Sequence, residues 1–164
     1  MREILFRGKP LVPNGSAFVK NPQLIKEDGF IYGHLGVNGD AYSITPIDMD
    51  QYSVLRPAFK VIPETVGEYT GFKDMNGKMI FEDDIVYNHI GDKKVVDRII
   101  FLNGCFCMDR QAFDYEFTYQ DTSKFEVIGN FHDNPEILDN INNTQKVLDK
   151  LNEETFVMNK GEKV

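Results

Sequence analysis

Three of the four Asn-Gly pairs in this chain lie between runs of β-forming residues, and these three constrain its fold more than any other feature. They stand at 38–39, 76–77 and 103–104. Asn-Gly readily supplies the positive φ angles of a tight turn between two antiparallel strands. Each pair is therefore predicted to mark a hairpin tip, and the chain is predicted to be mainly β.

Residues 61–86 hold the clearest local pattern. Gly67 and Gly71 interrupt a run of β-forming residues, and such glycines are typical of bends, bulges or close backbone approaches. The stretch ends in three consecutive carboxylates, Glu82, Asp83 and Asp84. Neighbours on an extended chain point to opposite faces, which disfavours a metal site or an acid/base pair. We interpret this triplet as a turn in which an Asp side chain accepts a backbone N–H.

Further strands are predicted where β-forming residues recur or alternate with polar ones. We expect them at 3–7, 30–35, 42–44, 95–102, 105–108, 113–119 and 125–128, with brief strands at 17–19 and 52–55. Asn134-Pro135-Glu136 has the chemistry of a helix start, because Asn can cap, Pro suits the first turn and Glu favours the positive helix end. A C-terminal helix is predicted to follow.

Composition limits the classes of function. A hydrophobic fraction of 41% can fill a core, and the formal net charge is −8. That charge opposes general nucleic-acid binding, in which Lys and Arg neutralise phosphates. No apolar run is long enough to span a bilayer, and the N-terminus lacks the apolar region of a signal peptide, so a cytoplasmic location is expected.

The segment PETVGEYTGFKDMNGKMIFEDDIV at 63–86 resembles the YopX family, small proteins found mainly in bacteriophages and prophages. Shorter matches extend the resemblance up to the C-terminal tail: REILFRGK at 2–9, FIYG at 30–33, VIGN at 127–130 and NPEIL at 134–138. The family pattern has tryptophan at the position of Phe30 and glycine at that of Asp83. A glycine there can adopt a left-handed conformation that Asp tolerates less well.

The resemblance implies a small SH3-type β-barrel with additions. Since the family's molecular activity is uncharacterised, it carries over no catalytic residue. Together with the strand pattern it leads us to expect a mainly β (α+β) fold of three parts. These are an N-terminal antiparallel β unit at 1–60 packing on the barrel, an SH3-like YopX-type barrel at 61–133, and a C-terminal helix and tail at 134–164.

The cysteines are the first candidates for chemistry. Cys105 and Cys107 share one face of a predicted strand and could form half of a thiolate metal site. A structural zinc site usually needs four ligands, and the chain has no second cysteine pair. The histidines, at positions 34, 89 and 132, show no ligand spacing. We therefore interpret both cysteines as small buried hydrophobes and predict no metal, cofactor or catalytic residue.

An interaction surface is the second candidate. The row Phe113, Tyr115, Phe117 and Tyr119 alternates with polar residues, which is typical of an inward-facing strand but also of an exposed partner surface. Lysines decorate the predicted hairpin tip at 76–77, where they usually solvate loops. The candidate surface residues are Tyr115, Tyr119, Lys73 and Lys78.

We expect a non-enzymatic protein-binding or assembly module that acts on an unknown bacterial host or phage protein. Self-association through the C-terminal helix is a further expectation, because its predicted apolar stripe could pack on another copy. One alternative is a nucleic-acid-binding small barrel, which would need a contiguous basic surface. Arg2, Arg7, Lys9 and Lys20 make only the N-terminal region locally basic. The other alternative, an enzyme, is disfavoured for want of a catalytic constellation.

Overall fold

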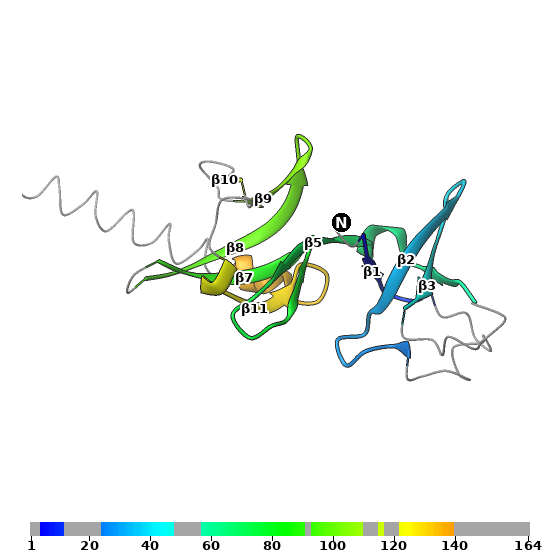
Figure 1. Ribbon diagram of the computed structural model, residues 1–164, viewed down its shortest axis with the longest axis horizontal. Coiled ribbons are helices and arrows are strands. Elements are labelled where there is room, and N and C mark those ends of the chain that lie inside the picture. Colours follow the sequence, from blue (N-terminus) through cyan, green and yellow to red (C-terminus); the bar gives the residue numbers. More distant parts are fainter. Residues whose placement is uncertain are drawn as a thin grey trace, which may run out of the picture.

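The computed structural model describes residues 4–11, 24–47, 57–90, 93–109, 115–116 and 122–139. They form two antiparallel sheets that lie side by side along the long axis of the molecule, with a short helix at 135–139 (Figure 1). The prediction of a mainly β protein is confirmed. The brief strands expected at 17–19 and 52–55, and any helix beyond 139, lie outside the described residues.

The first sheet has the strand order β4-β3-β2-β1-β5-β6. Its strands are β1 (Phe6–Gly8), β2 (Ile31–Asn38), β3 (Ala41–Pro46), β4 (Phe59–Val61), β5 (Gly67–Lys73) and β6 (Met79–Phe81). The sequence pattern did not predict β4, which runs across the boundary drawn between 60 and 61. A 3-10 turn, η3 (Pro63–Thr65), connects β4 to β5.

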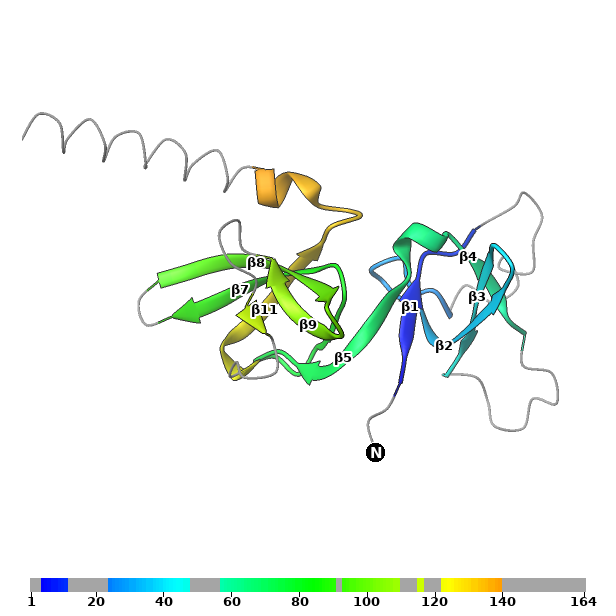
Figure 2. The same ribbon diagram turned by 90° about the horizontal axis from the view of Figure 1, so that it is seen from above.

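The second sheet has the order β10-β9-β8-β7-β11. Its strands are β7 (Asp84–Ile90), β8 (Lys93–Leu102), β9 (Cys105–Asp109), β10 (Tyr115–Glu116) and β11 (Phe125–Asn130), and the 3-10 turn η5 (Thr122–Lys124) precedes β11. Strand β5 connects the two parts of the molecule. Its start pairs with β1, its later residues pair with β6, and Figure 2 shows it running from the first sheet towards the second.

All three Asn-Gly predictions are confirmed. Asn103 and Gly104 both have positive φ angles, 52° and 84°, in a two-residue turn that pairs Leu102 of β8 with Cys105 of β9. Gly77 at the β5–β6 tip has φ 81° and Gly39 at the β2–β3 tip has φ 57°. A left-handed glycine is thus present at all three tips, and Asn103 is the one asparagine of the three that is left-handed as well.

The two glycines of the central stretch also behave as predicted. Gly71 has φ 90° and lies within an irregularity of the β5–β6 register, between Tyr69 and Lys73. At Gly67 an added Cβ would come within 2.7 Å of the Glu82 carbonyl oxygen. One glycine therefore bends the strand, and the other allows two backbones to approach closely.

Three hydrophobic clusters fill the described part of the molecule. One lies within the first sheet and contains Leu24, Ile31, Ile44, Phe59 and Val61. A second contains Ile80, Val86, Ile99, Phe106, Met108 and Phe125, so Ile80 of β6 packs with the second sheet. The third contains Leu5, Tyr69 and Phe81, with Tyr32 packed against it. The β5–β6 hairpin thus contributes to cores on both sides.

The strand pairings of the described residues form two open sheets, and no closed barrel is present among them. The SH3-like closure stays a prediction. The part of the chain that the structure describes contains no helix long and apolar enough to cross a membrane.

Candidate functional site

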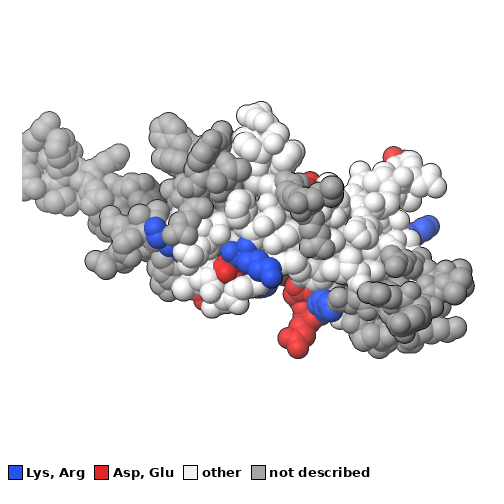
Figure 3. All heavy atoms as spheres, viewed as in Figure 1, with Lys and Arg blue, Asp and Glu red and all other residues white. Residues whose placement is uncertain are grey.

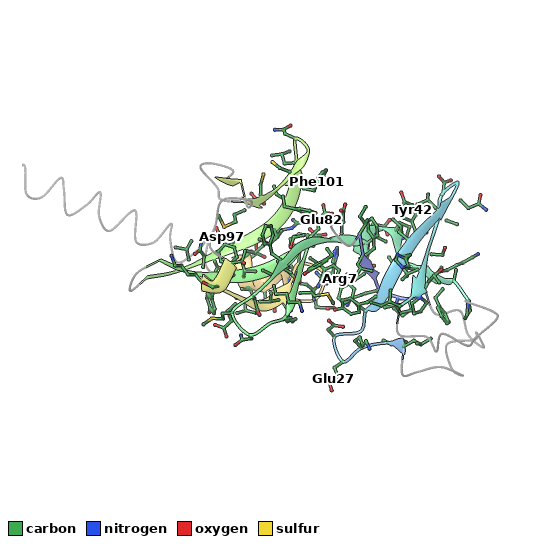
Figure 4. The ribbon with its side chains drawn as sticks, viewed as in Figure 1. Arg7, Glu27, Tyr42, Glu82, Asp97 and Phe101 are labelled. Atoms are coloured by element: carbon green, nitrogen blue, oxygen red, sulfur yellow. The ribbon has the colours of Figure 1, made fainter. Side chains whose placement is uncertain are left out.

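Arg7 of β1 occupies the junction between the two sheets (Figure 4). Its side chain is 3% exposed, and its Nη1 lies 2.7 Å from Oδ1 of Asp84, which is 1% exposed. Nη2 donates to the Glu82 carbonyl oxygen at 3.1 Å. The guanidinium carbon lies 4.6 Å from the ring centre of Phe30 and 5.0 Å from that of Phe81. Arg7 is therefore a core residue and does not add to a basic surface.

The carboxylate triplet forms the predicted turn. The Oδ2 atom of Asp84 accepts a hydrogen bond from the Phe81 N–H at 2.8 Å. Asp83 has φ 67°, the left-handed conformation that glycine adopts most readily. Two hydrogen bonds from Arg98 to Asp83 Oδ1, at 2.9 and 2.6 Å, hold this aspartate in place.

His132 completes this cluster, with Nε2 3.0 Å from Oδ2 of Asp83. No spacing in the sequence indicates this contact, because the histidine pairs with a carboxylate 49 residues away. The described residues contain no group of three or more His, Cys, Asp or Glu side chains arranged to hold a metal ion. The contacts of Asp83 and Asp84 are those of a structural turn.

Two carboxyls of the triplet have raised pKa values. Burial raises the pKa of Asp84, although the Arg7 guanidinium acts in the opposite direction. Burial also raises the pKa of Glu82, with a further contribution from the neighbouring charge of Asp83 and a partial offset from backbone hydrogen bonds at Glu68 and Phe101. Both carboxyls therefore bind a proton more readily in the folded chain than in the unfolded one.

Replacing Glu82 with glutamine is expected to raise the free energy of unfolding at neutral pH. A carboxyl whose pKa is higher in the folded chain binds more protons there than in the unfolded chain, so its contribution to stability falls as the pH rises through that interval. The excess stability of Glu82→Gln over the wild type should therefore shrink as the pH is lowered from about 7 to about 4, where an ordinary glutamate becomes protonated. Urea denaturation across this range measures it.

Glu64→Gln is the matched control for the Glu82 experiment, because Glu64 lies exposed on η3. A surface substitution of this kind should change stability by no more than about 0.5 kcal/mol. An advantage of Glu82→Gln that grew on acidification would contradict the expected sign.

A pocket of about 220 Å³ lies beside this junction, and we call it the junction pocket. Its lining comes from segments far apart in the chain: Lys26, Tyr32, Ile47, Lys78, Met79 and Phe81. Both lysines are exposed, while Met79 and Tyr32 are half-buried and Phe81 is buried. The pocket therefore combines an apolar lining with two exposed ammonium groups.

Tyr32 forms a fixed wall of this pocket. Its hydroxyl donates to Asp28, and its ring meets that of Phe81 edge to face with centroids 5.2 Å apart. Burial raises the pKa of the Tyr32 phenol, and the hydrogen bond to Asp28 adds to the effect. The phenol thus stays neutral and acts as a positioning group.

Of the four predicted surface residues, the structure describes the side chains of Lys73 and Lys78. Lys78 lines the junction pocket, whereas Lys73, at the end of β5, is exposed and is not part of that lining. Tyr115 lies in β10, where its backbone pairs with Met108, but its side chain and the whole of Tyr119 fall outside what the structure describes.

Sequence reasoning missed the remaining lining residues, because no spacing or motif connects the loop before β2 with the β5–β6 tip. Tyr32 stands in the FIYG segment and was assigned only to a strand.

On the face shown in Figure 3, Lys and Arg atoms form small separate groups with Asp or Glu atoms nearby, and no broad basic surface covers the described residues of that face.

Comparison with known proteins identifies the family of this chain. The family described as YopX protein matches residues 39–139, more than half of the 164-residue chain. The chain belongs to the YopX family. Residues 39–139 include β3 to β11 and therefore Lys78, Met79 and Phe81 of the junction pocket.

One solved structure similar to this YopX-family chain is that of protein EF1440 from Enterococcus faecalis. The match has 23% sequence identity and covers 84% of this chain and 99% of that one. The TM-score of this match is 0.40. No curated protein matches the sequence.

Proposed function

We propose that this chain is a non-enzymatic module, encoded by a phage or prophage, that binds a segment of a protein partner in the cytoplasm of the bacterial host. The observation that carries this proposal is the junction pocket, where Lys26 and Lys78 flank the apolar side chains of Met79 and Phe81. A matching ligand is an acidic peptide segment that presents an apolar side chain next to a carboxylate.

The size of the pocket favours a peptide anchor over a cofactor. Its volume of about 220 Å³ falls below the range of roughly 300–1,000 Å³ that is typical of small-molecule sites. A single inserted side chain needs less room. Two exposed lysines at the rim would then meet the polar part of the segment outside.

Fixed walls support affinity, since a binding site that is already ordered loses less entropy on association. The Asp28 hydrogen bond holds Tyr32, and the Phe81 N–H is bonded to the buried Asp84 carboxylate at 2.8 Å. The lining that contacts an inserted side chain is thus built on strands of the framework and on a buried ion pair.

We also propose that β5 to β11 form the SH3-like barrel expected from the family resemblance. The support is the shared core: Phe72 of β5 and Ile80 of β6 pack with Val86, Ile99 and Phe125 of the second sheet. The β5–β6 hairpin lies over the second sheet in this arrangement, as a strand pair does when it closes a small barrel. A barrel of this kind would present the junction pocket at its contact with β2 and β3.

The binding proposal is tested with a displayed library of random peptides selected on the full chain. We expect enrichment of acidic peptides with an apolar anchor. A selected peptide should bind Lys78→Glu at least about tenfold more weakly than the wild type, which corresponds to about 1.4 kcal/mol. Fluorescence polarisation measures the affinity, and higher salt should weaken it.

Lys73→Glu is the matched control, because Lys73 is an exposed lysine on the same hairpin outside the pocket lining. It should change the affinity by less than about threefold, since only screened surface charge is altered. Equal losses in the two variants, or selection of basic peptides, would reject the junction pocket as the docking point.

A further inference from the structure

The two cysteines of the chain stand close together at one end of β9. Cys105 and Cys107 alternate with Phe106 along the strand and so share a face, as the sequence predicted. Their Sγ atoms lie 3.5 Å apart. Cys107 is buried, with 4% of its surface exposed, as expected for a small hydrophobe, but Cys105 is only partly buried. One thiol of the pair is therefore accessible from solvent.

The backbone fixes the positions of the two cysteines, and rotation about each Cα–Cβ bond sets the distance between their sulfur atoms. Strand β9 pairs with β8 on one side and with β10 on the other, so its backbone cannot shift freely. Cys105 follows the tight Asn103-Gly104 turn, and its Sγ lies 3.4 Å from the Leu102 carbonyl oxygen. The two cysteines are thus held in place by the sheet.

This geometry suits chelation better than a disulfide. A disulfide needs an S–S bond of about 2.05 Å and Cα atoms about 4.4–6.8 Å apart. Residues two apart on a strand have Cα atoms separated by about 6.6 Å, near the upper limit, so closing the bond would strain β9. Two thiolates bound at about 2.3 Å on opposite sides of a two-coordinate ion lie about 4.6 Å apart, so rotation about the Cα–Cβ bonds must open the observed 3.5 Å by about 1 Å.

We propose that Cys105 and Cys107 form a two-thiolate site for a thiophilic metal ion of the Cu(I) class. Each thiol releases its proton to solvent as its sulfur binds, so two S–metal bonds form and no electron is transferred. Structural zinc usually takes four protein ligands, and the described residues offer no cluster of three candidate ligands. Soft Cu(I) is selected by thiolates and accepts fewer ligands, which makes it the better match.

A second pocket adjoins Cys105 at one end of the pair. It has a volume of about 380 Å³, and Cys105 borders it. The other lining residues are mostly apolar: Thr70, Gly71, Phe72, Phe101, Gly104 and Phe106. Figure 4 shows Phe101 on the β8–β9 hairpin. Phe101 and Phe106 meet on the face of the sheet opposite the two thiols, so an ion would approach the pair from the other face and meet the partly buried Cys105 first.

The test is an anaerobic titration in which the reduced full-length chain competes with a coloured Cu(I) chelator. We expect the wild type to withdraw one Cu(I) per chain. Cys105→Ser and Cys107→Ser should each bind at least about tenfold more weakly, since the loss of even an outer-shell partner costs about 10–100-fold in metal affinity. Circular dichroism shows whether each variant is folded, and Cys105→Ser is the safer of the two because that side chain is only partly buried.

Met75→Leu serves as the control, because Met75 is 52% exposed and offers a soft thioether away from the cysteines. Its affinity for Cu(I) should equal that of the wild type. Failure of the wild type to take Cu(I) from the chelator would overturn the proposal, and so would unchanged affinity in folded Cys105→Ser. Both outcomes are independent of peptide binding at the junction pocket.

Discussion

Replacing Arg7 with methionine is expected to lower the free energy of unfolding by about 3–5 kcal/mol, the cost of leaving one member of a buried ion pair without its partner. The methionine retains much of the apolar contact with Phe30 and Phe81. Asp84, 1% exposed, would keep the Phe81 N–H as its hydrogen-bond donor but lose the guanidinium. Chemical denaturation measures the loss.

The loss should depend on pH in a defined direction. Burial raises the pKa of Asp84, and the opposing effect of the guanidinium disappears in Arg7→Met. The folded variant would then hold a proton that the unfolded chain releases, so its stability should recover as the pH falls towards the unfolded-state pKa. A loss that is equal at neutral and acidic pH would show that packing, and not charge, dominates at this position.

A second variant measures how much Arg7 and Asp84 stabilise each other. Asp84→Asn removes the charge but retains an oxygen that can accept the Phe81 N–H, and the double variant Arg7→Met/Asp84→Asn leaves no buried charge at the junction. The double variant should be more stable than the sum of the single losses predicts, by about 0.5–3 kcal/mol of coupling. Strict additivity would mean that the two residues do not stabilise each other.

Lys9→Met provides the matched control for this ion pair. Lys9 follows Arg7 by two residues and also pairs with a carboxylate, that of Asp133, but the two side chains are 25% and 35% exposed. Burial acts to raise the pKa of Asp133, and hydrogen bonds from Lys9 and Asn130 outweigh it and lower the pKa. An exposed pair of this kind should contribute no more than about 1 kcal/mol.

The parts of the fold that the sequence predicted are those fixed by local backbone chemistry. Asn103-Gly104 forms a hairpin turn because both residues tolerate positive φ angles, whatever surrounds them. At Asp83 the family pattern has glycine, and the aspartate disfavoured a left-handed conformation; the observed φ of 67° shows that Asp83 adopts it nonetheless. Information of this kind lies within a few neighbouring residues.

The candidate site could not be predicted in the same way, because it depends on contacts between distant segments. Arg7 looks like one more basic residue near the N-terminus, and only its pairing with Asp84, 77 positions later, makes it part of the core. Lys26 and Lys78 likewise line one pocket without any shared motif. Charge alone did not distinguish Lys78 from Lys73, since both flank the same hairpin tip.

Replacing Asp74 with alanine is expected to have the second-largest effect, a loss of about 2–4 kcal/mol, because three part-buried backbone N–H groups would lose a charged acceptor. Asp74 is 6% exposed, and its carboxylate accepts three backbone hydrogen bonds. The donors are Asn76 at 2.8 Å, Lys78 at 2.9 Å and Val127 at 3.0 Å. The side chain therefore shapes the β5–β6 tip and also fastens it to β11. Thermal and urea denaturation measure the loss.

Asp74→Asn and Asp109→Ala separate this effect from general damage. Asp74→Asn keeps one acceptor oxygen, so it should lower the free energy of unfolding by less than Asp74→Ala does. Asp109 is exposed at the end of β9, and replacing it with alanine should lower the free energy of unfolding by no more than about 0.5 kcal/mol. Since Asp74 also fixes the backbone of Lys78, Asp74→Ala should weaken peptide binding at the junction pocket even where the chain remains folded. A stable Asp74→Ala chain with wild-type affinity would show that neither the hairpin tip nor the pocket needs this carboxylate.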